Sequence, residues 1–224
     1  VVKQTEKAKT NSIYLGFNGA TGKYVPDFIP TVDFVNLYAA TDFRKSVYLK
    51  QLPCIIQGVN FPTMWVVNKF PGNPALFTGT YTNYQHAPKV FRSAEQYLIY
   101  AEAAAKVGGA SEALALTALN TLRTARGLTA LSGVTGSALM TEIRNERTRE
   151  LAFEGQRWFT LKRMGQDVIN RQMRTYAGDG EFFPNYFCGG KDPRVNWQDH
   201  YINWPIYQGD LDLLGPNYPQ NDGY

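Results

Sequence analysis

Hydrophobic residues follow a helical period only in the middle of the chain. Between residues 90 and 174 they recur every three or four positions, as on one face of an α-helix. Elsewhere, glycine and proline interrupt the hydrophobic positions, and a regular helix does not continue through such interruptions. The pattern therefore predicts a mainly α fold, α+β by count, in which a helical scaffold carries long loops and a few short strands.

Two of the predicted helices are joined by only a few residues. The apolar face of the first helix consists of Ala94, Leu98, Ala101 and Ala105. Gly108 and Gly109 end this helix, and Ser111 is the expected cap of the next one. The apolar face of the second helix consists of Leu114, Ala118, Leu122 and Ala125. Helices joined so briefly must lie antiparallel, and the small residues Ala101 and Ala113 favour a single tetratricopeptide-like pair.

A third helix is predicted over residues 137–165, and its inward face becomes acidic halfway along. Leu139 and Ile143 begin this face, which continues by steps of three or four to Glu146, Glu150 and Glu154. Burying unpaired carboxylates would cost several kcal/mol each, so the face requires cations. Candidate cations include Arg126, Arg144 and Arg149 as well as the arginines of the predicted set. We predict a structural ion-pair network that fixes how three helices dock. Its predicted members are Arg92, Glu95, Arg123, Glu146, Arg147, Glu150, Glu154 and Arg157.

The remaining parts of the chain read as loops with short elements. Strands are expected at 13–17 and 46–52, a short helix at 32–40, and a further helical turn at 168–174. We therefore expect a loop-rich lobe (1–90), a helical tetratricopeptide-like core (90–174) and a loop-rich C-terminal segment (175–224). Within the helical core, Trp158 and Phe159 are expected to be buried.

Three separated motifs carry a resemblance to a known family. They are FRSAEQYLIYAEA, ERTRELAFEGQRWFTLKR and the terminal WPIYQGDLDLLGPNYPQNDGY. Together they resemble the C-terminal part of the SusD/RagB family of nutrient-binding outer-membrane lipoproteins of Bacteroidetes, over roughly residues 42–224. Asp42-Phe43-Arg44 resembles the family's Asp-x-Arg turn. Thr160 and Tyr207 depart from the family, which usually has an acidic residue and often a proline there.

The resemblance implies a function without catalysis. Family members capture oligosaccharides, or peptides in some relatives, at the cell surface and deliver them to a TonB-dependent transporter of the SusC type. It also implies an outer-membrane location through a lipid anchor upstream of this chain, no cofactor, and a helical N-terminal half that this chain lacks. Two alternatives stay open: a glycoside hydrolase that uses acidic residues in the late loop, and a helical interaction scaffold without a small ligand.

Composition and candidate chemistry narrow these alternatives. The net charge is +4, and the lysines and arginines are interspersed with acidic residues rather than clustered, which argues against nucleic-acid binding. No apolar run approaches the ~20 residues of a membrane span. Arginines near Glu146, Glu150 and Glu154 lower the pKa values of these carboxylates, which suits permanent anions rather than a general acid. Asp179 and Glu181 are two positions apart in a predicted turn, which does not hold the geometry that catalysis needs. Asp210 and Asp212 lack the ligand number of a calcium site, so no metal is expected, and Asp210 is expected to cap a helical turn.

Cysteine and histidine add little chemistry. Cys54 and Cys188 are the only cysteines, and two buried thiols are favoured over the disulfide that an oxidising compartment would allow. His86 and His200 stand alone, so neither zinc nor histidine-based catalysis is expected.

Aromatic residues in polar loops are the best candidates for ligand contact. Rings stack on the apolar faces of sugars, while neighbouring amides and carboxylates bind hydroxyl groups. The candidate ligand-binding residues are Tyr24, Trp65, Tyr81, Tyr84, Phe183, Tyr186 and Trp197. Among them, Trp65, Tyr81 and Tyr84 are preferred because glycine and proline brace the segments that carry them.

Overall fold

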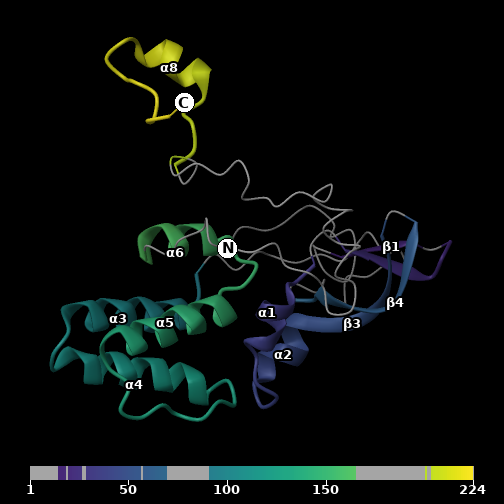
Figure 1. Cartoon of the computed structure of the whole chain (residues 1–224), viewed down its shortest axis with the longest axis horizontal. Coiled ribbons are helices and arrows are strands. Elements are labelled where there is room, and N and C mark those ends of the chain that lie inside the picture. Colours follow the sequence, from purple (N-terminus) through teal and green to yellow (C-terminus); the bar gives the residue numbers. More distant parts are fainter. Residues whose placement is uncertain are drawn as a thin grey trace. The chain divides into compact units, whose positions relative to one another are not determined.

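Figure 1 shows the computed structural model of the chain. The structure describes residues 15–18, 20–26, 29–56, 58–69, 91–164, 200 and 203–223. The chain divides into two compact units, residues 1–157 and 158–224. The predicted helix at 168–174 lies outside the described residues.

The first unit begins with a small β-sheet. Its strands are β1 (Leu15–Asn18), β2 (Lys23–Pro26), β3 (Leu49–Ile56) and β4 (Val59–Val67), in the order β1-β2-β3-β4. The pairs β1–β2 and β3–β4 are antiparallel, whereas β2 and β3 are parallel. The Asn18 side chain accepts hydrogen bonds from the N–H groups of Ala20 and Thr21 at 3.0 and 3.1 Å, which fixes the first turn. Gly58, with a φ of 88°, supplies the left-handed residue of the second turn.

Two short helices lie between β2 and β3. Helix α1 is Val32–Asn36, and α2 is Phe43–Tyr48. Asp42 caps α2, because its carboxylate accepts a hydrogen bond from the N–H group of Arg44 at 3.0 Å. The strand that we expected from residue 46 therefore begins only at Leu49, since the capped helix continues to Tyr48.

Three longer helices follow: α3 (Ser93–Val107), α4 (Ser111–Thr124) and α5 (Gly136–Glu150). Helix α3 packs against both α4 and α5, and α3 and α4 form the predicted hairpin (Figure 1). The predicted apolar face of α4 was partly wrong, because Leu114 and Ala125 are exposed and Ala115 and Leu119 are buried instead. Residues 113–116 are all apolar, so the period alone could not select the inner face. Helix α4 begins at Ser111 itself, without a side-chain cap.

The predicted third helix is interrupted. Helix α5 ends at Glu150, turns occupy residues 151–155, and α6 (Arg157–Met164) begins after them. Phe153 and Gly155 have φ values of 60° and 76°, which an α-helix cannot contain. The Phe153 ring packs edge-on against Phe34, with 5.4 Å between ring centroids. Tertiary packing thus stabilises a turn where the sequence period predicted a continuous helix.

The core of the first unit has a helical part and a sheet part. Ala94, Leu98 and Leu122 form the helical part with Leu151 from the turn after α5. The sheet part consists of Val35, Tyr38 and Leu49, with the partly buried Phe34, Tyr48, Trp65 and Phe153 packed against it. The prediction of a mainly helical fold with a few short strands is confirmed. Within the described residues, no helix has both the length and the apolar character that crossing a membrane requires.

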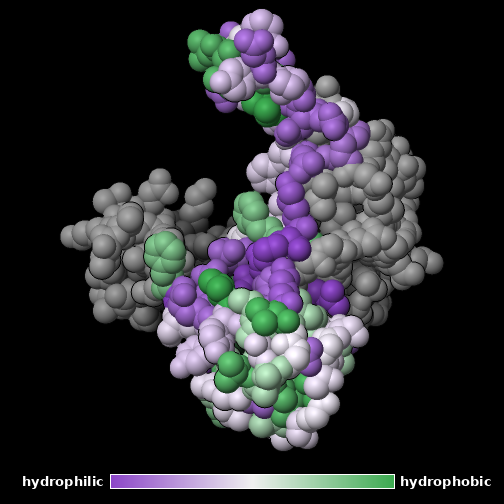
Figure 2. All heavy atoms as spheres, turned by 90° about the vertical axis from the view of Figure 1, so that its left-hand side faces the viewer, coloured by the Kyte–Doolittle hydropathy of each residue, from purple (hydrophilic) through white to green (hydrophobic). Residues whose placement is uncertain are grey.

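Some hydrophobic residues are exposed at the helical end of this unit. Val107 and Leu114, on either side of the link between α3 and α4, are both exposed. Figure 2 looks onto this end and shows hydrophobic residues as small separate patches among polar ones. Scattered apolar residues of this kind are normal for a protein surface.

The second unit contains most of α6 together with α8 (Gln208–Leu214). The rings of Trp158 and Trp204 lie 6.3 Å apart, and the Gln220 side chain exchanges two hydrogen bonds with the backbone of Ile206. Trp158 is half-buried, but Phe159, expected in the core, is 59% exposed. It lies in a short helix in which Thr160 and Leu161 are the buried residues among those whose side chains are described. Asp210 lies in the first turn of α8, after Tyr207 as N-cap, rather than at the cap itself.

Candidate ligand-binding site

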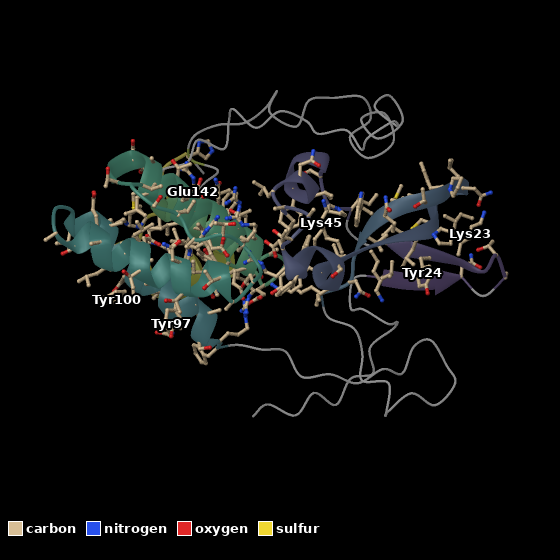
Figure 3. All side chains as sticks on the ribbon, turned by 90° about the horizontal axis from the view of Figure 1, so that it is seen from below. Lys23, Tyr24, Lys45, Tyr97, Tyr100 and Glu142 are labelled. Carbon is tan, nitrogen blue, oxygen red and sulfur yellow. The ribbon has the colours of Figure 1, made fainter. Side chains whose placement is uncertain are left out.

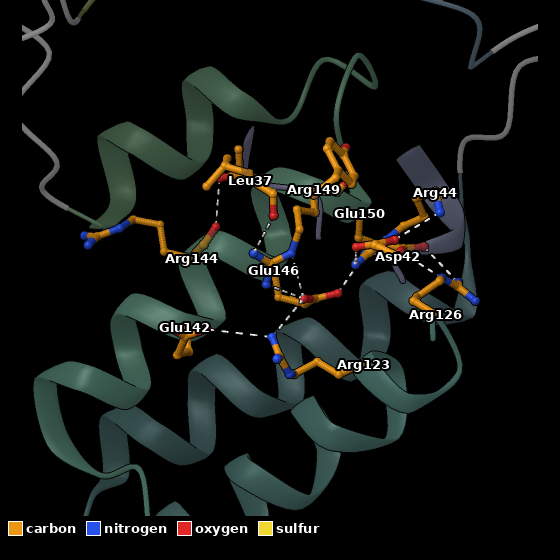
Figure 4. A network of polar contacts seen from close by, with 12 residues as sticks. Leu37, Asp42, Arg44, Arg123, Arg126, Glu142, Arg144, Glu146, Arg149 and Glu150 are labelled. Carbon is orange, nitrogen blue, oxygen red and sulfur yellow. Dashed lines mark hydrogen bonds and ion pairs between the residues drawn. The ribbon is translucent and has the colours of Figure 1, made fainter. Parts of the chain in front are cut away.

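Glu150, the last residue of α5, lies at the centre of a buried ion-pair network. Its side chain is fully buried and accepts four hydrogen bonds from three arginines, of which Figure 4 labels Arg44 and Arg126. Arg92 donates at 2.7 Å, Arg44 at 2.8 Å, and Arg126 at 2.9 and 3.0 Å. Both carboxylate oxygens are therefore saturated, which offsets the cost of burying the charge.

Glu146, one turn earlier on α5, is equally buried. Arg149 donates two hydrogen bonds to it at 2.6 and 3.1 Å, Arg44 donates one at 2.6 Å, and Arg123 lies 3.7 Å away. Arg44 also makes a two-bond contact with Asp42 at 2.7 and 2.9 Å. One guanidinium group from α2 thus contacts three carboxylates, two of them on α5 (Figure 4).

Lys69, after the end of β4, closes the network near the turn that follows α5. Its ammonium group donates to the backbone oxygens of Glu150 and Ala152 at 2.7 and 2.9 Å and pairs with the Glu154 carboxylate. Arg92 binds the same carboxylate with two hydrogen bonds at 2.8 and 3.1 Å. Burial lowers the pKa of Lys69 to about 8, although the contact with Glu154 opposes the shift.

The members of the predicted network have different surroundings. Glu146, Glu150, Glu154, Arg92 and Arg123 meet in the contacts above. Arg147 instead lies 4.0 Å from Glu102, and Arg157 donates to the Thr148 hydroxyl at 2.7 Å. Glu95 forms no ion pair with another described residue.

Sequence reasoning missed Asp42, Arg44 and Lys69 as network members. The Asp-x-Arg spacing at 42–44 was a usable signal for the first two, because a capping aspartate beside an arginine is a ready carboxylate–guanidinium pair. Nothing in the sequence linked Lys69 to residues about eighty positions later.

The network suits permanent charges rather than proton transfer. Burial alone would raise the pKa of Glu150, but hydrogen bonds from Arg126 and Arg92 hold it at about 2. A general acid needs a carboxyl group that is protonated near the working pH, and Glu150 is ionised throughout. Cys54 is a buried thiol whose pKa burial raises to about 11, and Cys188 lies outside the described residues. No group of acidic, histidine or cysteine side chains in the described ranges could hold a metal ion.

Trp65 belongs to β4, whereas we expected it in a loop. Its partly buried side chain packs against the Val35–Tyr38–Leu49 cluster, and Gln51 is its partner across the β3–β4 pair. The Lys45 ammonium group lies 5.9 Å from the centroid of the Trp65 ring. This half-buried ring, exposed amide and cation form the candidate ligand-binding group, which we call the Trp65 group.

Of the other candidates, only Tyr24 lies in a described segment. It belongs to β2, pairs with Cys54 of β3, and is half-buried. Five candidates lie outside the described residues: Tyr81, Tyr84, Phe183, Tyr186 and Trp197.

The chain is thus a mainly helical protein with a small sheet and a buried arginine–glutamate network, and sequence comparison identifies its family. The profile of the SusD family matches residues 54–224, which is most of the chain. The chain therefore belongs to the SusD family. A comparison with curated protein sequences gave no match.

Solved structures of similar fold support this assignment. A SusD superfamily protein from Bacteroides vulgatus is 26% identical with a TM-score of 0.61, over 88% of this chain and 39% of that one. A SusD-like carbohydrate binding protein from the same species is 26% identical with a TM-score of 0.53, over 65% of this chain and 29% of that one. NanU from Bacteroides fragilis shares the fold, with 20% identity and a TM-score of 0.55 over 88% of this chain and 39% of that one. The chain thus spans well under half the length of each.

Proposed function

We propose that this protein captures glycans, or peptides, at the bacterial surface without cleaving them. The captured ligand is then passed to a TonB-dependent outer-membrane transporter of the SusC type. In this proposal the protein works at the outer face of the outer membrane and uses no cofactor. Membership of the SusD family supports it, as does the 26% identity to a relative described as a carbohydrate binding protein.

One observation favours capture over hydrolysis. The two paired carboxylates of the described network, Glu146 and Glu150, are fully buried and bound by arginines. A glycosidase needs one carboxyl group that donates a proton and another that reaches the sugar. Neither residue has a free oxygen, so hydrolysis would have to use acids outside the network, such as Asp179 and Glu181 of the late loop, which lie outside the described residues.

The Trp65 group supports a binding role on chemical grounds. An indole ring offers a stacking surface for a sugar, and the amide of Gln51 can both donate and accept hydrogen bonds. Tyr24 and the five aromatic candidates outside the described residues remain predicted contacts. In this proposal they would extend the surface beyond Trp65.

The test is retention of glycans with analysis of the products. The protein is run through affinity gels containing a panel of glycans, and parallel samples are incubated with the same glycans and with peptides. Retention with intact chains supports capture, and shortened chains would mean a hydrolase. Absence of binding to every glycan and peptide would leave the interaction scaffold as the better interpretation.

The transporter step needs a separate experiment. A tagged version of the natural protein is purified from its native membrane in mild detergent, and the associated proteins are identified. We expect a TonB-dependent transporter to co-purify in a stable ratio. Its absence under conditions that preserve other outer-membrane complexes would contradict the delivery step while leaving capture intact.

A further inference from the structure

Lys45 is a half-buried cation beside an aromatic ring. It lies in the last turn of α2, and its ammonium nitrogen is 5.9 Å from the centroid of the Trp65 ring. Figure 3 shows Lys45 on α2, where the helices give way to the sheet. Cations near indole rings are attracted by the π-electrons, so the two side chains stabilise each other's positions.

The charge of Lys45 is not matched by a carboxylate in the described part of the chain. The Lys45 ammonium group donates one long hydrogen bond, of 3.4 Å, to the backbone oxygen of Tyr38. The nearest acid in sequence, Asp42, is bound by Arg44 through two hydrogen bonds. In contrast, the partly or fully buried cations Arg44 and Lys69 both contact carboxylates.

The segment that carries Lys45 is basic overall. Residues 15–69, which hold the sheet and both short helices, contain five basic and three acidic residues. Gln51, opposite Trp65 in the β3–β4 pair, is exposed and neutral. The Trp65 group therefore combines a stacking ring, a hydrogen-bonding amide and a cation that retains capacity for an anion.

We propose that the Trp65 group selects carboxylated sugars, and this inference rests on the proposed glycan-binding function. The apolar face of a uronic-acid ring would stack on the accessible part of Trp65. Its carboxylate would accept a charge-assisted hydrogen bond from Lys45, which is stronger than the present bond to a neutral carbonyl. The Gln51 amide would bind a neighbouring hydroxyl group.

The test compares acidic oligosaccharides with their own neutral forms. Oligogalacturonides, alginate oligomers and glucuronate-containing oligosaccharides are each titrated by calorimetry before and after chemical reduction of their carboxyl groups. We expect the acidic form of at least one oligosaccharide to bind about tenfold more tightly than its reduced form. A factor of about ten is what one hydrogen bond to a charged group contributes to affinity. High salt should reduce that advantage.

Three variants assign the selectivity to Lys45. Lys45→Met should remove the preference for the acidic form, and Lys45→Arg should retain most of it. Lys50→Met removes an equal charge from an exposed position of β3 and should leave the preference unchanged. Thermal unfolding of each variant checks that the fold is intact, and Lys45→Gln replaces Lys45→Met if the latter unfolds.

The outcomes separate this inference from the proposed function. Equal binding of acidic and reduced forms, or a preference that survives Lys45→Met, would overturn the selectivity while leaving glycan capture standing. Binding only to neutral glycans would likewise overturn the selectivity for carboxylated sugars and leave glycan capture standing. If no glycan of either kind binds, both the selectivity and the proposed function fail.

Discussion

At the scale of single residues, Glu150 organises much of the buried charge of the first unit. Three arginines from α2, from the residue before α3 and from the turn after α4 bind its two oxygens. Each of these arginines would be left with an unmet hydrogen-bonding group if the carboxylate were removed. A buried pair of this kind is costly to break even where its net contribution to stability is small.

We predict that Glu150→Ala lowers the free energy of unfolding by ~3 kcal/mol or more, because it leaves buried arginine groups unpaired. Urea denaturation of the purified variant measures this. The matched control is Glu142→Ala on the same helix, whose carboxylate is partly exposed and 3.7 Å from Arg123. That substitution should cost under ~1 kcal/mol. Equal small effects would contradict the buried network.

The lowered pKa of Glu150 also predicts a dependence on pH. Its ordinary value is 4.5, and the folded value is about 2. The unfolded state binds the proton first as the pH falls, so this stabilisation is complete above about pH 4.5 and is lost between there and about pH 2. The shift corresponds to about 3 kcal/mol.

Comparison with Glu150→Gln isolates this one group. The variant has no carboxylate at position 150, so the difference in stability between wild type and variant should shrink steadily as the pH falls from about 4.5. Urea unfolding of both proteins at matched pH values measures the difference. A difference that stays constant over this interval would show that Glu150 does not titrate in the predicted way.

At the scale of elements, the turn after α4 makes a close contact with the start of α2. The backbone N–H of Phe43 donates to the carbonyl of Arg126 at 3.0 Å. Gly127 has a φ of 80°, and a β-carbon there would clash with the Thr41 carbonyl and lie 2.9 Å from the Phe43 ring. This approach brings α2 to α4, and with it Arg44 to the carboxylates of α5.

We predict that Gly127→Ala destabilises the protein by ~2–4 kcal/mol, from backbone strain together with the displaced contact. Gly133→Ala is the control, because Gly133 also has a positive φ, of 66°, but open space around it. It should cost only ~1 kcal/mol, the strain alone. Thermal unfolding of both variants provides the comparison, and equal losses would mean that the close approach is unimportant.

The break between α5 and α6 shows how packing can replace a predicted element. The sequence period continues through residues 151–155, so no local signal ended the helix except Gly155. In the folded chain the turn brings Glu154 to Arg92 and Lys69 and brings the Phe153 ring to Phe34. These contacts offset the cost of a non-glycine residue with positive φ.

At the scale of the whole molecule, the helices dominate the secondary structure. In the described part of the chain, the four strands are short relative to α3, α4 and α5, which have 15, 14 and 15 residues. We predict a far-UV circular dichroism spectrum with the paired minima of α-helix. A spectrum dominated by β-structure would contradict the fold.

The acidic stripe on residues 146–154, the hairpin of α3 and α4, and the mainly helical class could all be predicted from the sequence. These features depend on local periodicity, short links and the cost of burying unpaired charge, which are properties of a chain segment. The family motifs are equally local, because each is a continuous run of residues, and the residues alone carry the resemblance to SusD/RagB.

The partners of the stripe and the surroundings of Trp65 were decided only by the tertiary structure. Arg44 and Lys69 meet Glu150 from positions 106 and 81 residues earlier in the chain. Trp65 likewise acquires Lys45 and Gln51 as neighbours through the end of α2 and the register of β3 with β4. Periodicity predicts the face that a residue occupies within its own element. Which distant side chain meets that face depends on how the elements pack together.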